Sequence, residues 1–242
     1  MSGADGSGSL YLLPVWLGET GGPEQMPTEN AALAGRITRW FCEHEKSARS
    51  ALRRLVPAID LSRLELHRFD KDSTPAYARE LIGLLRDGRD AAVISEAGMP
   101  GIADPGASLV RAAHEAGIPV IPLTGPSALL LGLAASGLNG QRFCFHGYLP
   151  VKPPERRQAI NRLELEARRT GAAQLFIETP YRNEALLADM LKECQPATVL
   201  SIAVDATQPG GWIRTRTVAQ WQRDRPVLGK RPAVFILGTW PQ

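Results

Sequence analysis

Hydrophobic and polar positions divide the chain into short apolar runs and longer segments of helical periodicity. The run SLYLLPV at 9–15 predicts a buried first strand that ends at Pro14. After a loop rich in glycine and proline, Thr28 can cap a helix. Its apolar positions, spaced i, i+4, i+7 and i+8, would share one face: Leu33, Ile37, Trp40 and Phe41.

The clearest helical signal is followed by an alternation of strand and helix. Thr74 is placed as an N-cap, Pro75 occupies the first turn, and Gly88 is placed to close the segment. The β-branched run AAVIS at 91–95 then predicts a strand, followed by a helix from about 107 to 116 and a second strand, IPVIP, at 118–122. Strand, helix and strand in this order predict a right-handed parallel crossover.

The second half of the chain has a different pattern. The segment 127–136 is apolar nearly all round, so we expect a helix buried between layers. A basic, proline-rich stretch and a charged helix at 154–170 follow. A further helix and several apolar runs then predict a mixed sheet, the runs being 173–178, 198–204, 213–218 and 233–237.

These elements predict an α/β protein of two domains. A parallel-sheet N-terminal domain would cover 10–123 and a mixed-sheet C-terminal domain 124–242, after a flexible leader at 1–9. The composition fits this picture, because 44% hydrophobic residues in 242 are typical of a globular chain. The net charge of +3 falls short of the imbalance of a dedicated nucleic-acid binder.

Cysteine and histidine spacing gives no sign of a metal site. Cys42, Cys144 and Cys194 are far apart and are expected to be reduced structural thiols. None of the histidines has a ligand partner at metal-binding spacing, so we expect no metal. The most apolar stretch, 129–135, is too short to cross a membrane, and the N-terminus lacks signal-peptide features. These observations favour a cytoplasmic protein without membrane contact.

Candidate chemistry is concentrated in two loops that follow predicted strands. The loop SEAGMPGIADPG at 95–106 combines three glycines with two prolines, so its backbone can approach a ligand closely, and Glu96 could accept hydrogen bonds from ribose hydroxyls. A tight connection with Asp104 capping the next helix explains the same residues equally well. The loop LTGPSALL at 123–130 could bind an anion, although a plain helix start is the better interpretation of it alone.

Five segments, taken together, resemble motifs of the tetrapyrrole methylases, and within them the ribosomal RNA small-subunit methyltransferase I subfamily. SEAGMPGIADPG is similar to the subfamily's SDAGTPxISDPG, and TGPSA at 124–128 to its PGPxA. The segments RFCFHGYLP, FIETPYR and AVFILG are similar to its RFxFxGFLP, its FYESPHR and its last strand. The similarities run in order from about residue 10 to 238, which a chance likeness of one loop would not produce.

The resemblance implies a tetrapyrrole-methylase-like fold with a cleft between its two domains that holds S-adenosyl-L-methionine. The sulfonium of this cofactor favours nearby carbonyl and carboxylate oxygens, and its adenine favours apolar walls. Carried over residue by residue, the resemblance assigns the cofactor-binding role to Pro14, Glu96, Ile102, Ser127, Ala128, Glu178 and Ala206.

Three segments depart from the family's pattern, and all lie where a substrate is expected to enter. The opening PTPIGN is here PVWLGE at 14–19, AEDTR is CEHEK at 42–46, and ARELTK is AVDATQ at 203–208. The second segment keeps an acid and a base, so Glu43 and Lys46 are the candidate catalytic residues in a charged cluster expected at the end of a helix. A merely solvated surface is the commoner explanation of such a cluster.

These observations predict a SAM-dependent methyltransferase. The first substrate hypothesis is 2'-O-methylation of small-subunit ribosomal RNA. The alternatives are methylation of a small molecule and a catalytically inactive SAM-binding interaction module. Two basic sets could contact phosphates, one on the helix after Lys152 and one between Arg214 and Arg231, although the acidic residues interleaved in the first favour a solvated helix. The resemblance also implies a homodimer, for which 129–135 or the tryptophans Trp212, Trp221 and Trp240 could form an interface.

Overall fold

The computed structural model describes residues 6–240, which form two compact units that divide at Ser127 and Ala128. The first unit contains a five-stranded sheet in the order β3-β2-β4-β1-β5, and all its strand pairs are parallel. The strands are β1 (Leu10–Leu13), β2 (Arg39–Cys42), β3 (Glu65–Arg68), β4 (Ala91–Ile94) and β5 (Val120–Pro122). The predicted parallel N-terminal sheet is therefore confirmed.

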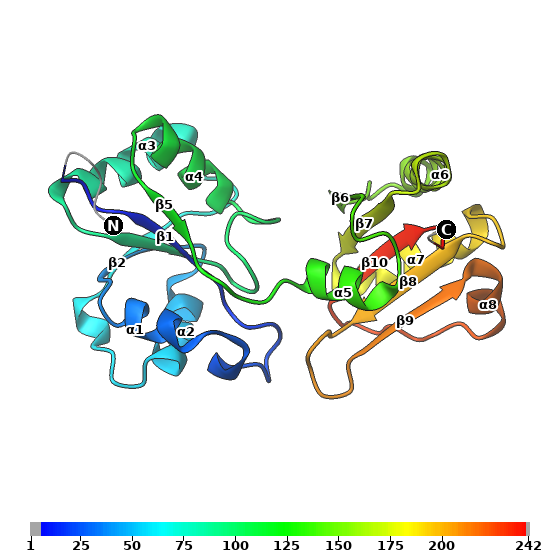
Figure 1. Ribbon diagram of the computed structural model, residues 1–242, viewed down its shortest axis with the longest axis horizontal. Helices are drawn as coiled ribbons and strands as arrows, with labels where there is room; N and C mark the ends of the chain where they lie inside the picture. The colour runs from blue at the N-terminus through cyan, green and yellow to red at the C-terminus, as the bar shows by residue number, and fades with distance from the viewer. Residues whose placement is uncertain (1–5, 241–242) are drawn as a thin grey trace. The chain divides into compact units, whose positions relative to one another are not determined.

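Helices cover both faces of this sheet (Figure 1). On one face, α1 (Thr28–Ala34) and α2 (Glu45–Leu55) pack in a core around Trp40 and Leu52. On the other face, α3 (Pro75–Gly83) and α4 (Gly106–Glu115) pack in a core around Phe41 and Leu109. Short 3₁₀ segments complete the unit, namely η1 (Pro23–Gln25), η2 (Leu61–Arg63) and η3 (Leu84–Asp87). A sheet buried on both faces explains the almost continuous apolar runs of β2 and β4.

The second unit is a mixed five-stranded sheet in the order β6-β7-β10-β8-β9. Its strands are β6 (Phe143–Tyr148), β7 (Ala173–Glu178), β8 (Val199–Val204), β9 (Trp212–Thr217) and β10 (Ala233–Gly238). Only the β6–β7 pair is parallel. One face carries α5 (Ala128–Ser136), and the other carries α6 (Pro153–Thr170), α7 (Asn183–Glu193) and α8 (Val218–Arg223), with η4 (Pro180–Arg182) before α7. The predicted mixed C-terminal sheet is confirmed.

The helix predicted after Thr28 is too long. The helix α1 ends at Ala34, whereas Trp40 and Phe41 lie in β2, between β3 and β4, with no exposed surface. Burial on both sides of a central strand outweighed the helical spacing of these side chains. The charged cluster at 43–46 accordingly follows β2 and runs into the first turn of α2, which contains Glu45 and Lys46, instead of closing the predicted helix.

Two further expectations also differ from the structure. Residues 1–5 of the expected leader lie outside the described residues, but Gly8 donates a backbone hydrogen bond to Leu85 and Ser9 is fully buried, so the ordered part begins before residue 10. The helix α5 is not buried all round, because Leu130 is 49% and Leu131 38% exposed. Within residues 6–240, no helix has both the length and the hydrophobicity required to span a bilayer.

Candidate functional site

Loops that follow the parallel strands of the first unit converge at one edge of its sheet. Val15, after β1, exchanges two backbone hydrogen bonds of 2.9 Å with Gly98, after β4. Gly125, after β5, packs so closely on the first loop that an added Cβ would lie 2.3 Å from Pro14 Cβ. The carboxyl ends of parallel strands are where ligands bind in open α/β sheets. This edge therefore gathers Pro14, Glu43, Glu96 and Ser127.

The loop at 95–106 is closed from within by its own polar side chains. Asp104 Oδ1 accepts backbone hydrogen bonds from Gly101 (2.6 Å) and Gly106 (2.8 Å), and Ser95 Oγ donates to the Gly98 carbonyl (2.7 Å). Ala103 has a φ of 58°, which a non-glycine residue seldom adopts. These contacts hold the turn while Ile102 at its tip stays 44% exposed. An exposed apolar side chain on a rigid loop can provide one wall of a ligand site.

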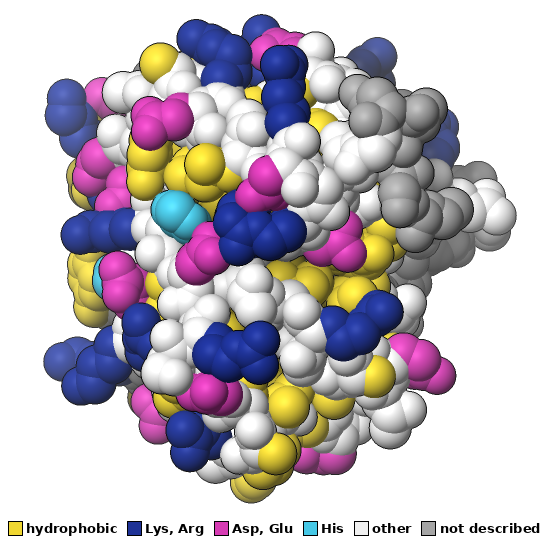
Figure 2. Space-filling model, turned by 90° about the vertical axis from the view of Figure 1, so that its left-hand side faces the viewer, with side chains coloured by type: hydrophobic (Ala, Val, Ile, Leu, Met, Phe, Trp, Pro, Cys, Tyr) yellow, Lys and Arg dark blue, Asp and Glu magenta, His cyan; other side chains and the backbone are white. Residues whose placement is uncertain are grey.

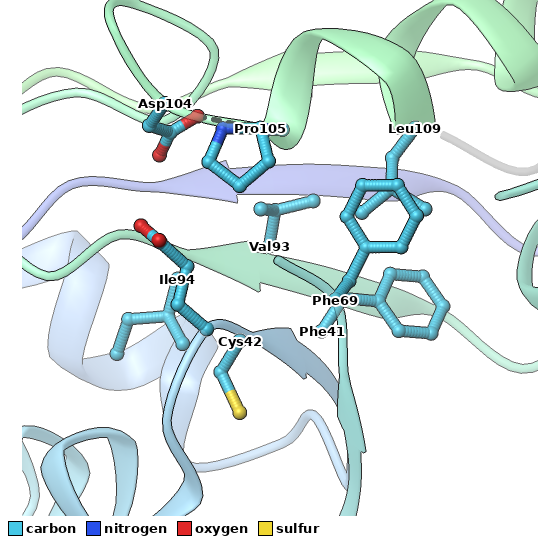
Figure 3. Close-up of a pocket in the computed structure, with 10 residues that line it drawn as sticks. Phe41, Cys42, Phe69, Val93, Ile94, Asp104, Pro105 and Leu109 are labelled. Carbon is cyan, nitrogen blue, oxygen red and sulfur yellow. Dashed lines mark hydrogen bonds between the residues drawn. The ribbon is translucent and has the colours of Figure 1, made fainter. Parts of the chain in front are cut away.

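Glu43 lies in an acidic environment beside an apolar hollow. Phe41, Val93 and Leu109 line the hollow, and Asp104 lies at its rim (Figure 3). Burial raises the pKa of the Glu43 carboxyl, and the negative charges of Asp104 and Glu96 raise it further. Burial also raises the pKa of Asp104. A carboxyl whose pKa is moved toward neutrality suits proton transfer, so Glu43 remains a candidate general base.

The structure brings Glu96 to this cluster and leaves Lys46 outside it. Glu96 accepts a hydrogen bond of 2.7 Å from Ser47 Oγ and lies 3.4 Å from His44 Nδ1. Lys46 is exposed in the first turn of α2 and forms no ion pair with any described residue. Asp104, His44 and Ser47 were not among the residues selected from sequence. Asp104 belongs to the loop motif at 95–106 and His44 to the segment CEHEK at 42–46, whereas Ser47 had no sequence signal.

The acidic neighbours of Glu43 lead to a prediction about pH dependence. Asp104→Asn keeps the oxygen that accepts the Gly101 and Gly106 amides but removes a negative charge that raises the pKa of Glu43. The pKa of Glu43 should then fall, because its ionised form is less disfavoured. If Glu43 is the base, the acid limb of the pH–rate profile should move to lower pH. Asp72→Asn, which removes an exposed charge elsewhere, is the matched control, and a limb that does not move contradicts this role of Asp104.

In the second unit, Glu178 and Ala206 also lie at a common sheet edge. Ala233 at the start of β10 pairs with Glu178, the last residue of β7, and with Val204, the last residue of β8. The loop after β8 contains Ala206 between Asp205 (φ 46°) and Thr207 (φ 79°), both in the left-handed region. Strained loop residues of this kind are frequent at ligand sites.

Glu178 retains unused hydrogen-bonding capacity although its side chain is fully buried. Its Oε1 accepts from the Thr179 amide (2.6 Å) and from Arg182 Nε (2.8 Å) and Nη2 (2.5 Å). Its Oε2 is buried and has no donor among the described residues, and Asn183 Oδ1 is in the same condition. Buried acceptors without donors cost free energy, which a ligand that donates hydrogen bonds would recover.

The chain matches the family model of tetrapyrrole (corrin/porphyrin) methylases over residues 20–220. The chain belongs to this family. The matched residues include the loop at 95–106, the loop at 123–130 and Glu178 at the end of β7. Within the described residues no cluster of three metal-ligating side chains occurs.

Three relatives within the family share one name with each other, ribosomal RNA small subunit methyltransferase I. A protein of Micromonospora olivasterospora named ribosomal RNA small subunit methyltransferase I is 37% identical over 76% of this chain and 55% of its own length. A protein of the same name from Escherichia coli O157:H7 is 31% identical over 97% of this chain and 79% of its own length. A third, from Xylella fastidiosa, is matched over 63% of its length. The chain thus spans little more than half of the length of some of these relatives.

Solved structures show the same fold. The methyltransferase CobJ superposes with a TM-score of 0.63 at 22% identity and covers 96% of this chain and 95% of its own. The uroporphyrin-III C-methyltransferase of Thermus thermophilus, solved with S-adenosyl homocysteine, superposes with a TM-score of 0.56 at 17% identity and covers 96% of this chain and 97% of its own. The expected tetrapyrrole-methylase-like fold is therefore confirmed.

Proposed function

We propose that this protein is an S-adenosylmethionine-dependent methyltransferase that modifies the RNA of the small ribosomal subunit. The observation that carries the proposal is the match to the Escherichia coli O157:H7 relative, because it extends over 97% of this chain. Both units are therefore matched, and the strand-end loops of each are included. The proposed substrate is taken from the names of the relatives. The residues of the strand-end loops must then bind the cofactor and carry out the reaction.

The residues at the two sheet edges fit an adenosyl cofactor. In the first unit, Ile102 offers exposed apolar surface and Glu96 offers a carboxylate, while Pro14 and Ser127 are buried in the loops after β1 and β5. In the second unit, half-buried Ala128 and Ala206 offer small apolar surfaces, and Glu178 Oε2 is an acceptor without a donor. Ribose hydroxyls and the adenine amino group are donors that such carboxylates accept. We assign all seven residues to cofactor binding.

Glu43 would serve as the base of the reaction. When bound, S-adenosylmethionine supplies a methyl carbon on a positively charged sulfur, and transfer to a hydroxyl yields S-adenosylhomocysteine and one proton. The Glu43 carboxylate accepts the proton of the acceptor hydroxyl, for which its raised pKa is suited. Lys46, which is exposed in the first turn of α2, would contact a phosphate of the RNA. A ribose 2'-hydroxyl is the proposed acceptor.

We also propose that the enzyme acts in the cytoplasm, where ribosomes are assembled, as a homodimer. The exposed leucines of α5, Leu130 and Leu131, give it apolar surface for a second copy. Trp221 cannot contribute to an interface, because it has no exposed surface. Light scattering of the purified protein should give twice the chain mass of 26.3 kDa, and a monomer mass would exclude the dimer.

The reaction can be tested with labelled cofactor and cell extract. Purified protein and S-adenosylmethionine with a labelled methyl group are incubated with extract from cells that lack the gene. We expect label in small-subunit RNA, and nuclease digestion should release it as a 2'-O-methylnucleoside. Label in small molecules alone would indicate the small-molecule methylase, and cofactor binding without any transfer would indicate an inactive binding module.

A further inference from the structure

The two units carry charges of opposite sign. Residues 128–242 contain 15 Lys and Arg against nine Asp and Glu, whereas residues 1–127 contain 13 against 16. On the face of the molecule drawn in Figure 2, Lys and Arg lie among Asp and Glu and form no patch of one sign. The residue counts place the basic excess in the second unit, and such an asymmetry between parts of a chain is typical of proteins that bind a polyanion.

Most basic side chains of α6 are already used within the unit. Arg156 is buried and pairs with Asp189 at 2.5 Å, and Arg157 pairs with the other oxygen of Asp189 at 2.9 Å. Arg169 pairs with Glu166 at 2.9 Å. These arginines stabilise the packing and the surface of the helix. Arg162 and Arg168 are exposed on α6 without an ion pair to a described residue, but they stack on no aromatic ring there, unlike two arginines of β9.

On strand β9, two arginine side chains lie over tryptophan rings. The Arg214 guanidinium lies 5.2 Å from the centre of the Trp212 ring, and the Arg216 guanidinium lies 5.1 Å from the centre of the Trp221 ring. Trp221 is fully buried and donates a hydrogen bond of 2.8 Å to the Leu200 carbonyl, so the ring under Arg216 is held in place. Stacked arginines lose less conformational entropy when they bind a ligand, and they keep their charge.

The positive charge of this strand is only partly neutralised. Arg216 pairs with Asp224 at 2.6 Å, and both Arg216 and Arg214 lower the pKa of that carboxyl. Arg214 is exposed and forms no ion pair with a described residue, and the same holds for Arg223 at the end of α8. The strand and its neighbouring helix therefore offer more cationic groups than the single carboxylate can match.

The position of β9 connects these arginines with the proposed site. It is an edge strand and runs antiparallel to β8 (Figure 1). Trp212 lies opposite Val204, next to the loop that contains Ala206, whereas Arg216 lies opposite Leu200, farther along the sheet. Residues i and i+2 of a strand share a face and lie about 7 Å apart. This spacing is close to that of successive phosphates in a single strand.

We propose that β9 is an RNA-binding strand, on which Arg214 and Arg216 contact consecutive phosphates of a single-stranded RNA segment. The inference rests on the proposed function, because it assumes that the acceptor is RNA. The segment would extend along β9 away from the strand-end loops. Phosphate contacts fix the position of the chain without reading its sequence, so this strand orients the substrate and leaves selection of the nucleotide to other residues.

Fluorescence anisotropy of a labelled single-stranded RNA oligonucleotide, measured without cofactor over a series of salt concentrations, tests the proposal. Arg214→Ala should weaken binding and reduce the slope of log affinity against log salt by about 0.7, the value for one lost phosphate contact on a single strand. Arg214→Lys keeps the charge and should restore the slope. Arg162→Ala, which removes an exposed arginine from α6, should leave both quantities unchanged.

The outcomes separate this inference from the proposed function, because binding and methyl transfer are measured independently. Wild-type affinity and slope in Arg214→Ala would overturn the inference, and so would a wild-type protein that binds no RNA. RNA binding that depends on Arg214, without methyl transfer to RNA, would support the strand and contradict the enzyme. Methyl transfer to RNA by the wild type, together with unchanged RNA affinity and salt slope in Arg214→Ala, would support the enzyme and contradict the role of the strand.

Discussion

Replacement of Glu43 by Gln is expected to lower the rate of methyl transfer by roughly 10²- to 10⁴-fold, the usual contribution of a general base. This loss corresponds to about 3–5 kcal/mol of transition-state stabilisation. The reason is local, because Glu43 lies beside the hollow at the end of β2, and burial, Asp104 and Glu96 raise its pKa. The amide of Gln has nearly the same shape but cannot accept the proton.

The same substitution should leave the affinity for S-adenosylmethionine unchanged, because Glu43 is not assigned to cofactor binding. Single-turnover rates on small-subunit RNA and calorimetric titration of the cofactor separate the two effects. Glu45→Gln is the matched control, since it removes an exposed carboxylate two residues away, in the first turn of α2. An unaffected rate in Glu43→Gln would remove Glu43 from the mechanism.

Glu178→Gln is expected to weaken cofactor binding by roughly 10- to 100-fold, because a hydrogen bond to a charged group contributes about 1.5–3 kcal/mol. Arg182 donates to Oε1 from two nitrogens, so the amide oxygen of Gln should take that position. The amide nitrogen then replaces Oε2, and a donor stands where the cofactor's own donor requires an acceptor.

Calorimetric titration measures this loss, and melting curves show whether the variant is folded. Glu166→Gln is the control, because Glu166 forms a surface ion pair with Arg169 on α6 and is not part of the proposed site. Equal affinities of Glu178→Gln and the wild type would show that Oε2 does not contact the cofactor.

Local signals in the sequence predicted some elements well and others poorly. The helix α3 was predicted because its start is encoded by neighbours, and Thr74 Oγ1 indeed accepts a hydrogen bond from the Tyr77 amide. Strand β2 was missed because the spacing of Trp40 and Phe41 also fits a helix. Its conformation is decided by β3 and β4, which flank it and come later in the chain. Pairing between distant segments overrides local propensity at such positions.

In the candidate site, the sequence predicted only residues that belong to recognisable motifs. The loop at 95–106 was selected from its glycines, its prolines and its position after a strand, and Glu178 from the resemblance; the structure adds what lies next to them. Asp104 raises the pKa of Glu43 because their loops meet at one sheet edge, which no spacing in the sequence indicates. The buried oxygen of Glu178 without a donor is likewise a property of the fold. The altered segments at 14–19 and 203–208 gave no comparable information, although Trp16 proves to be buried under Arg54 at 4.4 Å.

Calorimetric titration of S-adenosylmethionine into the wild-type protein tests the central claim most directly, because every proposed step requires that the strand-end loops hold this molecule. We predict saturable heat at one site per chain, with competition by S-adenosylhomocysteine. A titration that releases only the heat of dilution would contradict the account.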